Sequence, residues 1–373
     1  MSTSTIAVFT GSRAEYGLLR PVLAAIESAE GLDSRVIAGG SHLIGDQPTI
    51  DEIRSERVVD AEVEMQVGTE RTRRSDADAV ARGIHGMSEV LSSMDPDLLL
   101  LLGDRIEVLA AATSASLLGI RVAHIHGGDV ATGVCDDSIR HAVTKLAHIH
   151  FPATELSASR IRRMGERPES IFVVGSPAVD GLDEIPIMSD ENWSKLGRPS
   201  FVILHHPTGD SDSAEFERMK KIIATVGSRG NTLLLSPNHD PGSDGIRKAI
   251  ELSGLPGLDH LERDAFIGLM KRTDTLVGNS SAGLIECAAL GTPAVDIGDR
   301  QTGREHPRTS VHVDSLTGLE LEVGLDRALA LRDQGADLRF GSGEAGTLIT
   351  RVLSNMSFVD FPIRKCWTEF NSD

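Results

Sequence analysis

The sequence predicts an α/β protein built from two doubly wound domains. The chain has 373 residues, more than a single hydrophobic core usually spans. Residues 97–102 are one aspartate followed by five leucines, the apolar run expected of a strand buried on both faces of a parallel sheet. Strand-like and helix-like segments alternate on both sides of this run, which is the pattern of parallel sheets covered by helices.

Strands in the first half are expected where short apolar runs precede a polar or glycine-containing loop, and helices where apolar residues recur at helical spacing. The expected strands span residues 6–10, 35–38, 61–65, 97–102, 121–126, 148–151 and 171–174. The expected helices span residues 18–26, 79–94, 108–118, 136–147 and 156–164. Residues 47–78 are mostly polar and charged and are interpreted as a mobile loop around the short strand near 61–65.

A linker over residues 185–199 leads into a second α/β region. Its expected strands span residues 201–204, 232–235 and 275–277, and its expected helices span 215–226, 245–252, 284–290 and 319–331. The predicted domains are therefore residues 1–184 and 185–355. Residues 356–373 form an apolar and aromatic tail, which we expect to pack back toward the N-terminal domain.

The composition argues against several classes of partner and site. A net charge of -18 argues against nucleic acid or an anionic membrane surface as a partner, so an anionic substrate would need a local cluster of Arg or His. The three cysteines are far apart and form no CxxC pair, which fits a reducing cytoplasm and offers no thiolate metal site. No signal peptide and no apolar run of membrane-spanning length is found, so a cytoplasmic protein is expected.

Residues 275–295 contain the clearest candidate for a phosphate-binding site. They read as a strand, a small polar loop at 278–281, a helix and another strand. Unpaired N–H groups at the start of that helix, together with the hydroxyls of Ser280 and Ser281, suit a phosphate. Glu286 follows in the helix, where a carboxylate could hold a ribose diol. The alternative is an ordinary serine cap on a core helix.

Other polar residues also follow predicted strands, where open α/β sheets bind ligands. They are Arg13, His42, Asp104, His124, His126 and Asp129 in the first half, and His206, Asn238, Ser280, Ser281 and Arg300 in the second. The first set suits proton transfer and the second suits anion binding, and facing domains would place both in one cleft. Arg13 could instead be a solvated surface charge, Asp104 could merely pair with Arg105, and Asp136 could be a helix cap.

Neither a cofactor nor a catalytic metal is expected from these residues. The glycine-containing loop at 11–17 is not a GxGxxG dinucleotide fingerprint. No HExxH motif is present, and His124, His126, His148 and His150 lack a familiar ligand spacing.

Six ordered motifs resemble a known family. Residues 11–19, 103–105, 124–128, 136–141, 278–281 and 298–301 resemble the hydrolysing UDP-N-acetylglucosamine 2-epimerases. That family includes the sialic acid and legionaminic acid pathway enzymes and the epimerase half of the animal bifunctional epimerase/kinase. The match runs in order from residue 5 to about residue 315. It implies the GT-B architecture, in which two Rossmann-like domains face each other across a cleft.

The resemblance also implies a reaction and a set of roles. The substrate would be a UDP-linked 2-acetamido sugar, which loses UDP and its C2 proton to give a 2-acetamidoglycal, and water then adds to release the free 2-epimer. By position, Asp104 and Asp136 look like the acid/base carboxylates, and His126 stands where some members have a catalytic Glu. The residues that fall where the family holds the substrate are Arg13, His42, His206, Asn238, Ser280, Ser281, Glu286 and Arg300. Asp129 departs from the pattern, because a Glu is expected there.

Three alternatives remain at this point. A non-hydrolysing 2-epimerase would return UDP to C1, a GT-B glycosyltransferase would need an acceptor, and a sugar-nucleotide-binding protein would lack catalysis. The sugar substituents at C4 and C6 and the identity of the base are left open by the sequence. A homodimer or homotetramer is expected from the family alone.

Overall fold

A computed structural model describes residues 3–45, 48–68, 72–131, 136–238, 240–316 and 319–368, and for Asp136 it describes the backbone alone. The chain divides into two compact units, which are described separately. Unit 1 comprises Met1–Asp129, Cys135–Asp180 and Gly341–Asp373, and unit 2 comprises Val130–Val134 and Gly181–Phe340. The chain thus returns to unit 1 at Gly341, earlier than the boundary at residue 356 that the sequence suggested.

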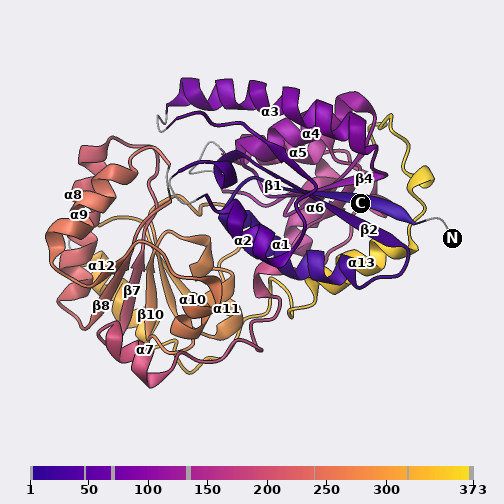
Figure 1. Cartoon of the computed structure of the whole chain (residues 1–373). Helices are drawn as coiled ribbons and strands as arrows, with labels where there is room; N and C mark the ends of the chain where they lie inside the picture. The colour runs from indigo at the N-terminus through magenta and orange to yellow at the C-terminus, as the bar shows by residue number, and fades with distance from the viewer. Residues whose placement is uncertain are drawn as a thin grey trace. The chain divides into compact units, whose positions relative to one another are not determined.

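Unit 1 contains a six-stranded, fully parallel sheet with the strand order β3-β2-β1-β4-β5-β6 (Figure 1). Its strands are β1 (Ser4–Thr10), β2 (Leu32–Gly39), β3 (Ala61–Val63), β4 (Leu98–Leu102), β5 (Arg121–Ile125) and β6 (Ile149–Phe151). Its helices are α1 (Arg13–Glu27), α2 (Ile50–Glu56), α3 (Arg73–Met94), α4 (Ile106–Leu118), α5 (Asp136–Leu146), α6 (Glu155–Arg163) and α13 (Ala345–Asn355). The order is that of a doubly wound Rossmann sheet.

Unit 2 repeats the same topology with the strand order β12-β11-β10-β7-β8-β9, again fully parallel. Its strands are β7 (Phe201–Leu204), β8 (Thr232–Leu235), β9 (Gly257–Leu258), β10 (Thr275–Gly278), β11 (Ala294–Ile297) and β12 (Ser310–Val313). Its helices are α7 (Asp190–Lys195), α8 (Asp212–Gly227), α9 (Ser243–Ser253), α10 (Arg263–Met270), α11 (Glu286–Leu290) and α12 (Glu320–Leu329).

Helices cover both faces of each sheet, which is why the strands are apolar on both sides. In unit 1, α1, α2 and α13 pack on one face, and α3, α4 and α5 pack on the other (Figure 1). In unit 2, α8, α9 and α12 cover one face, whereas α7, α10 and α11 cover the other. Every leucine of β4 is buried, as the apolar run predicted.

The structure corrects several predicted elements. Part of the segment interpreted as a mobile loop is helical, because α2 lies within it and α3 begins at Arg73 behind a capping box formed by Thr72 and Ser75. The strand expected at residues 171–174 is reduced to one isolated bridge, between Ile171 and His150. Helices α10 and α13 and strand β12 were not anticipated.

The C-terminal segment contacts unit 1 through its backbone and two long side chains. The Arg121 guanidinium donates to the Phe361 carbonyl at 2.8 Å, and Lys365 pairs with the buried Glu166 carboxylate at 2.7 Å. Trp367 lies beneath the Lys145 ammonium, 5.0 Å from it. Within the residues described here, no helix is both long and apolar enough to cross a membrane.

Candidate active site

The strand order of each sheet reverses at one point, and predicted site residues follow the strands on both sides of it. In unit 1 this point lies between β1 and β4, and in unit 2 it lies between β7 and β10. Adjacent loops leave such a point in opposite directions and open a crevice at the carboxyl ends of the strands, where doubly wound sheets bind ligands. Arg13 and Asp104 follow β1 and β4, while His206 and Ser280 follow β7 and β10. Each unit therefore carries a group of polar residues at its own reversal point.

Arg140 organises the polar group of unit 1. Its guanidinium, only 4% exposed, donates a hydrogen bond to the Asp104 carboxylate. The same guanidinium donates to the His126 carbonyl at 3.3 Å and lies 4.0 Å from the Asp129 carboxylate. A carboxylate beside a permanent positive charge is held in its ionised form, which is the form that a general base requires. Asp104 therefore pairs with Arg140, and the alternative partner Arg105 instead hydrogen-bonds Glu107 at 3.3 Å.

His126 follows β5 in a left-handed backbone conformation, with φ of 65°, which is rare for a side chain of this size. Its Nδ1 lies 3.0 Å from Asp129 Oδ2, and its Nε2 lies 2.8 Å from the hydroxyl of Ser176. A carboxylate oxygen only accepts, so Nδ1 carries the proton and Nε2 accepts from Ser176. Ser157 donates to the second Asp129 oxygen at 2.8 Å. The buried Asp129 thus fixes the tautomer and orientation of the imidazole.

His42 and Arg13 both have partners inside unit 1. The two ring nitrogens of His42 lie 3.0 Å from the Thr10 hydroxyl and 2.8 Å from the Thr49 hydroxyl. Burial lowers the pKa of His42 to about 4, so the ring is neutral near pH 7. Arg13 opens α1 and pairs with Glu52 at 2.9 Å, with both side chains partly exposed. Their predicted contacts with a substrate stay predictions.

The group of unit 2 is built around Asn279, which lies next to Gly278 at the end of β10 and is fully buried. Its side chain accepts from the His206 N–H at 2.7 Å and donates to the His206 carbonyl at 2.8 Å. Arg300 and Gln301 donate to the Asn279 carbonyl at 3.2 and 2.8 Å. One asparagine therefore joins the ends of β7 and β10 to the loop that carries Arg300.

Gly278 allows this close approach of the two strands. Its φ is 149°, and a Cβ added there would lie 2.0 Å from the Leu204 carbonyl oxygen. Any side chain would push β10 away from β7, because that distance is far inside van der Waals contact. The glycine is therefore a requirement of the loop geometry.

His206 presents a hydrogen-bond donor whose tautomer is set by the backbone. The Asn238 N–H donates to His206 Nδ1 at 3.2 Å, so Nδ1 is the acceptor and Nε2 carries the proton. Burial, and then the charge of Arg300, lower the pKa of His206 well below its usual range, which keeps the ring neutral. The Asn238 side chain donates to Asp240, while its own carbonyl oxygen is buried without a partner among the described residues. The group of unit 2 therefore contains a donor at His206 Nε2 and an acceptor at the Asn238 side chain.

The helix end that the sequence predicted to suit a phosphate differs from the prediction. The helix expected over residues 284–290 is the five-residue α11, and a single 3-10 turn, Ser281–Gly283, precedes it. Ser280 caps that turn by accepting from the Ala282 N–H at 3.4 Å. Glu286 lies 3.7 Å from the Arg263 guanidinium. The apolar spacing was correct, but it does not distinguish a tight turn followed by a short helix from one longer helix.

Several residues that shape the two groups were not singled out from the sequence. They are Arg140, Ser176 and Asn279, for which the sequence predicted no role. Ser176 directly follows a glycine at the end of an apolar run, a signal that could have suggested it. The backbone of Asp136 opens α5 one turn before Arg140.

Two Rossmann-type sheets, each with polar residues at its reversal point, define an α/β protein of the GT-B class, and comparison with known proteins identifies the family. A family model described as UDP-N-acetylglucosamine 2-epimerase matches residues 24–354, and the chain belongs to this family of enzymes. The resemblance inferred from the six motifs is therefore confirmed.

Individual relatives agree with this assignment. The chain is 33% identical over 370 residues to a Legionella pneumophila UDP-N,N'-diacetylbacillosamine 2-epimerase (hydrolyzing), covering 96% of this chain and 97% of the relative. It is 28% identical to a Neisseria meningitidis UDP-N-acetylglucosamine 2-epimerase, covering 98% and 99%. The structure of S. aureus MnaA with UDP superimposes with a TM-score of 0.80 at 17% identity, covering 99% of this chain and 100% of the other. This likeness confirms the predicted α/β fold.

Proposed function

We propose that the protein is a hydrolysing 2-epimerase of UDP-linked 2-acetamido sugars. The substrate is UDP-N-acetylglucosamine or a 4-amino-4,6-dideoxy derivative such as UDP-N,N'-diacetylbacillosamine, and the products are UDP and the free 2-epimer. The proposal rests mainly on one observation in unit 1. The buried guanidinium of Arg140 donates hydrogen bonds to both the Asp104 carboxylate and the His126 carbonyl. The full-length match to a relative named as hydrolyzing supports the hydrolytic outcome.

The first step is an elimination. The C1–O bond to UDP breaks, the electron pair leaves with the diphosphate, and a carboxylate takes the C2 proton to give a 2-acetamidoglycal. The C2 proton is barely acidic, so positive character must develop at C1 as UDP departs. Ionised carboxylates near the ring stabilise that charge and accept the proton. Asp104, ionised beside Arg140, supplies one of them, and Asp136 is proposed as the second because it matches the family motif.

The second step is a hydration. Water adds its oxygen to C1 of the glycal, and a proton is delivered to C2 on the other face of the ring, which gives the inverted sugar with a free C1 hydroxyl. The proton carrier for this face is proposed to be Asp136 or His126. Asp129 and Ser176 occupy both ring nitrogens of His126, so His126 can act on the sugar only through the Ser176 hydroxyl that lies 2.8 Å from its Nε2.

Unit 2 is proposed to hold UDP. The neutral His206 donates from Nε2 toward the diphosphate, Arg300 supplies positive charge, and the Asn238 carbonyl oxygen accepts from a ligand hydroxyl or N–H. Ser280 and Ser281 add hydroxyls, and Glu286 is proposed to meet the ribose. Arg13 and His42 of unit 1 are proposed to line the sugar side, with His42 acting through Thr10 and Thr49.

A second candidate function is a non-hydrolysing 2-epimerase, in which UDP is returned to C1. It is favoured by the relatives that are named without the word hydrolyzing, such as the Neisseria meningitidis protein. The two functions differ in their products. We expect free UDP to accumulate in step with epimerised sugar when the full-length protein is incubated with a panel of UDP- and GDP-linked amino sugars. A UDP-linked epimer without free nucleotide would instead establish the non-hydrolysing function.

A further inference from the structure

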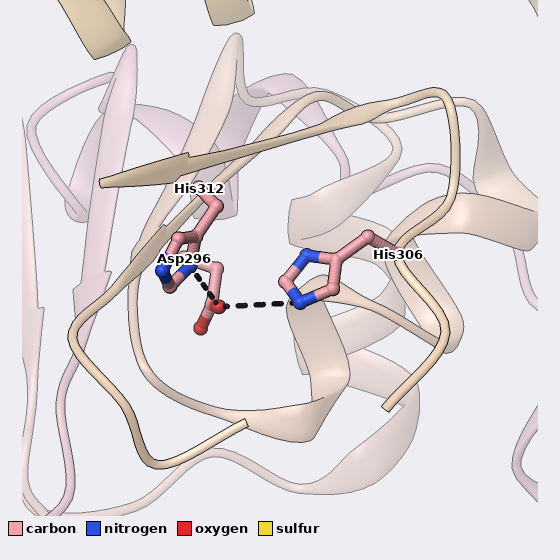
Figure 2. Close-up of side chains that lie close together, drawn as sticks. All are labelled: Asp296, His306 and His312. Atoms are coloured by element: carbon pink, nitrogen blue, oxygen red, sulfur yellow. Dashed lines mark hydrogen bonds and ion pairs between the residues drawn. The ribbon is translucent and has the colours of Figure 1, made fainter. Parts of the chain in front are cut away.

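Three side chains of unit 2 meet at the carboxyl end of β11. Asp296 lies in β11 and His312 lies directly opposite it in β12, since the two are register partners in the parallel ladder. His306 comes from the loop that joins the strands, and all three side chains point toward one another (Figure 2). We refer to Asp296, His306 and His312 as the Asp–His–His cluster.

The distances between the ligand atoms of the cluster are close to those found around a bound metal ion. His312 Nδ1 lies 2.9 Å and His306 Nε2 lies 3.9 Å from Asp296 Oδ2, and one ligand atom from each residue falls within 4.8 Å of the others. Ligands about 2.1 Å from a tetrahedral Zn²⁺ are separated by roughly 3.4 Å. Side-chain adjustments of about 1 Å, well within the reach of a partly exposed histidine, would bring the three atoms onto one ion.

The second oxygen of Asp296, which does not face the two imidazoles, is buried. Asp296 is only 4% exposed, and its Oδ1 has no hydrogen-bond partner among the described residues. A buried carboxylate oxygen without a partner costs considerable free energy, so such atoms usually mark an ion or a water.

The other nitrogen of His312 is arranged as it is in metal sites. His312 Nε2 lies 3.0 Å from the carboxylate of Asp314. Metal-bound histidines commonly donate their second N–H to a carboxylate, which leaves the first nitrogen with its lone pair toward the metal. In this cluster that lone pair faces Asp296 Oδ2, an arrangement that needs either a proton or a metal ion between the two atoms.

We propose that Asp296, His306 and His312 bind a divalent transition-metal ion of the Zn²⁺ class. Two imidazoles and one carboxylate are typical zinc ligands, whereas Mg²⁺ and Ca²⁺ prefer oxygen ligands. The ion joins β11 and β12 to the loop that carries Arg300, with a fourth position open to water.

Cobalt spectroscopy of the full-length chain tests the proposal without any nucleotide or turnover. The protein is stripped with a chelator, dialysed and titrated with Co²⁺, and Zn²⁺ is then added as a competitor. We expect visible absorption bands of tetrahedral Co²⁺ that saturate at one ion per chain, disappear with Zn²⁺, and accompany a rise in Tm because the ion binds the folded state. His306→Gln removes a ligand that is about one-third exposed, so the fold should survive, and its Co²⁺ affinity should fall by more than about 100-fold.

Two further variants define the outcome. Asp314→Asn weakens the orientation of His312 and should lower Co²⁺ affinity by about 10- to 100-fold. His85→Gln changes an exposed histidine beside Glu89 on α3 and should leave the titration unchanged. The proposal is overturned if the wild-type chain shows no cobalt bands and no metal-dependent rise in Tm, which would mean that a proton bridges Asp296 and His312. It is also overturned if His306→Gln binds Co²⁺ as the wild type does.

Discussion

The imidazole of His126 and the carboxylate of Asp129 form a buried hydrogen-bonded pair, with Nδ1 and Oδ2 separated by 3.0 Å. The sequence singled out Asp129 because a glutamate was expected there. In the structure the shorter acid reaches both His126 and Ser157 within a tightly packed turn, in which a Cβ added to Gly128 would lie 2.3 Å from the Ser157 carbonyl oxygen. The departure from the family pattern therefore has a local role, which is to orient the histidine.

The Asp129→Asn variant tests this orienting role. The amide no longer favours the Nδ1-protonated tautomer of His126, so the ring loses its fixed orientation. We expect kcat to fall by at least about 10-fold, while the Kd for UDP stays the same because the proposed UDP contacts lie in unit 2. Isothermal titration with UDP and steady-state kinetics separate the two effects. Asp326→Asn, at an exposed position on α12, is the matched control, and equal kinetics of the two variants would refute the role.

Asp104→Asn tests the proposed general base. Asparagine can still accept a hydrogen bond from Arg140 but cannot take up the C2 proton. The expected loss in kcat is about 100- to 10,000-fold, with UDP binding retained. Asp78→Asn, an exposed position on α3, serves as the control. Unchanged turnover in a folded Asp104→Asn protein would remove this residue from the mechanism.

His206→Ala tests the nucleotide site in unit 2. The variant keeps the backbone hydrogen bonds to Asn279 and loses the imidazole, both its Nε2 donor and the Nδ1 that accepts from the Asn238 N–H. A hydrogen bond to a charged phosphate contributes about 1.5–3 kcal/mol, so the Kd for UDP should increase by roughly 10- to 100-fold. Calorimetry with UDP is the measurement, and His260→Ala, a half-exposed histidine, is the control. Equal affinity in both variants would contradict the placement of UDP.

A buried carboxyl group makes the stability of unit 1 depend on pH. Burial, and then the nearby charge of Glu107, raise the pKa of Glu15 from 4.5 to about 8. Between these values the folded protein keeps a proton that the unfolded chain has lost, so this group's contribution to stability falls as pH rises, by about 1.4 kcal/mol per pH unit.

Glu15→Gln removes the pH-dependent contribution of Glu15 to the free energy of unfolding. The free energy of unfolding of the variant, relative to wild type, should therefore increase from pH 5 to pH 8 in urea titrations at each pH. The exposed Glu30→Gln is the control and should follow the wild-type profile. Parallel profiles for Glu15→Gln and wild type would show that Glu15 is ionised in the folded protein.

The strands and the positions of the candidate residues could be predicted because both depend on local pattern. An apolar run followed by a polar loop marks the carboxyl end of a parallel strand, and both Asp104 and His206 lie at such ends. Side-chain partners could not be predicted in this way. Arg140 pairs with Asp104, 36 residues away, and His126 meets Ser176, 50 residues away. These contacts depend on how β4, β5 and α5 pack.

The Asp–His–His cluster also could not be predicted from the sequence. The histidines that the sequence offers as candidate metal ligands, at positions 124, 126, 148 and 150, lack a familiar ligand spacing. His124 instead hydrogen-bonds the Gly103 carbonyl at 2.7 Å, and burial lowers its pKa to about 3. The residues that do meet, Asp296, His306 and His312, have no motif spacing and are joined only by the register of β11 and β12.

The most direct test of the proposed chemistry is NMR of the full-length protein turning over a UDP-linked 2-acetamido sugar in deuterated water. Elimination and hydration replace the C2 proton with one from solvent. The account predicts a free 2-epimer that carries deuterium at C2, formed in equal amount with free UDP. A free sugar that keeps its original configuration and its C2 proton, or an epimer still attached to UDP, would contradict it.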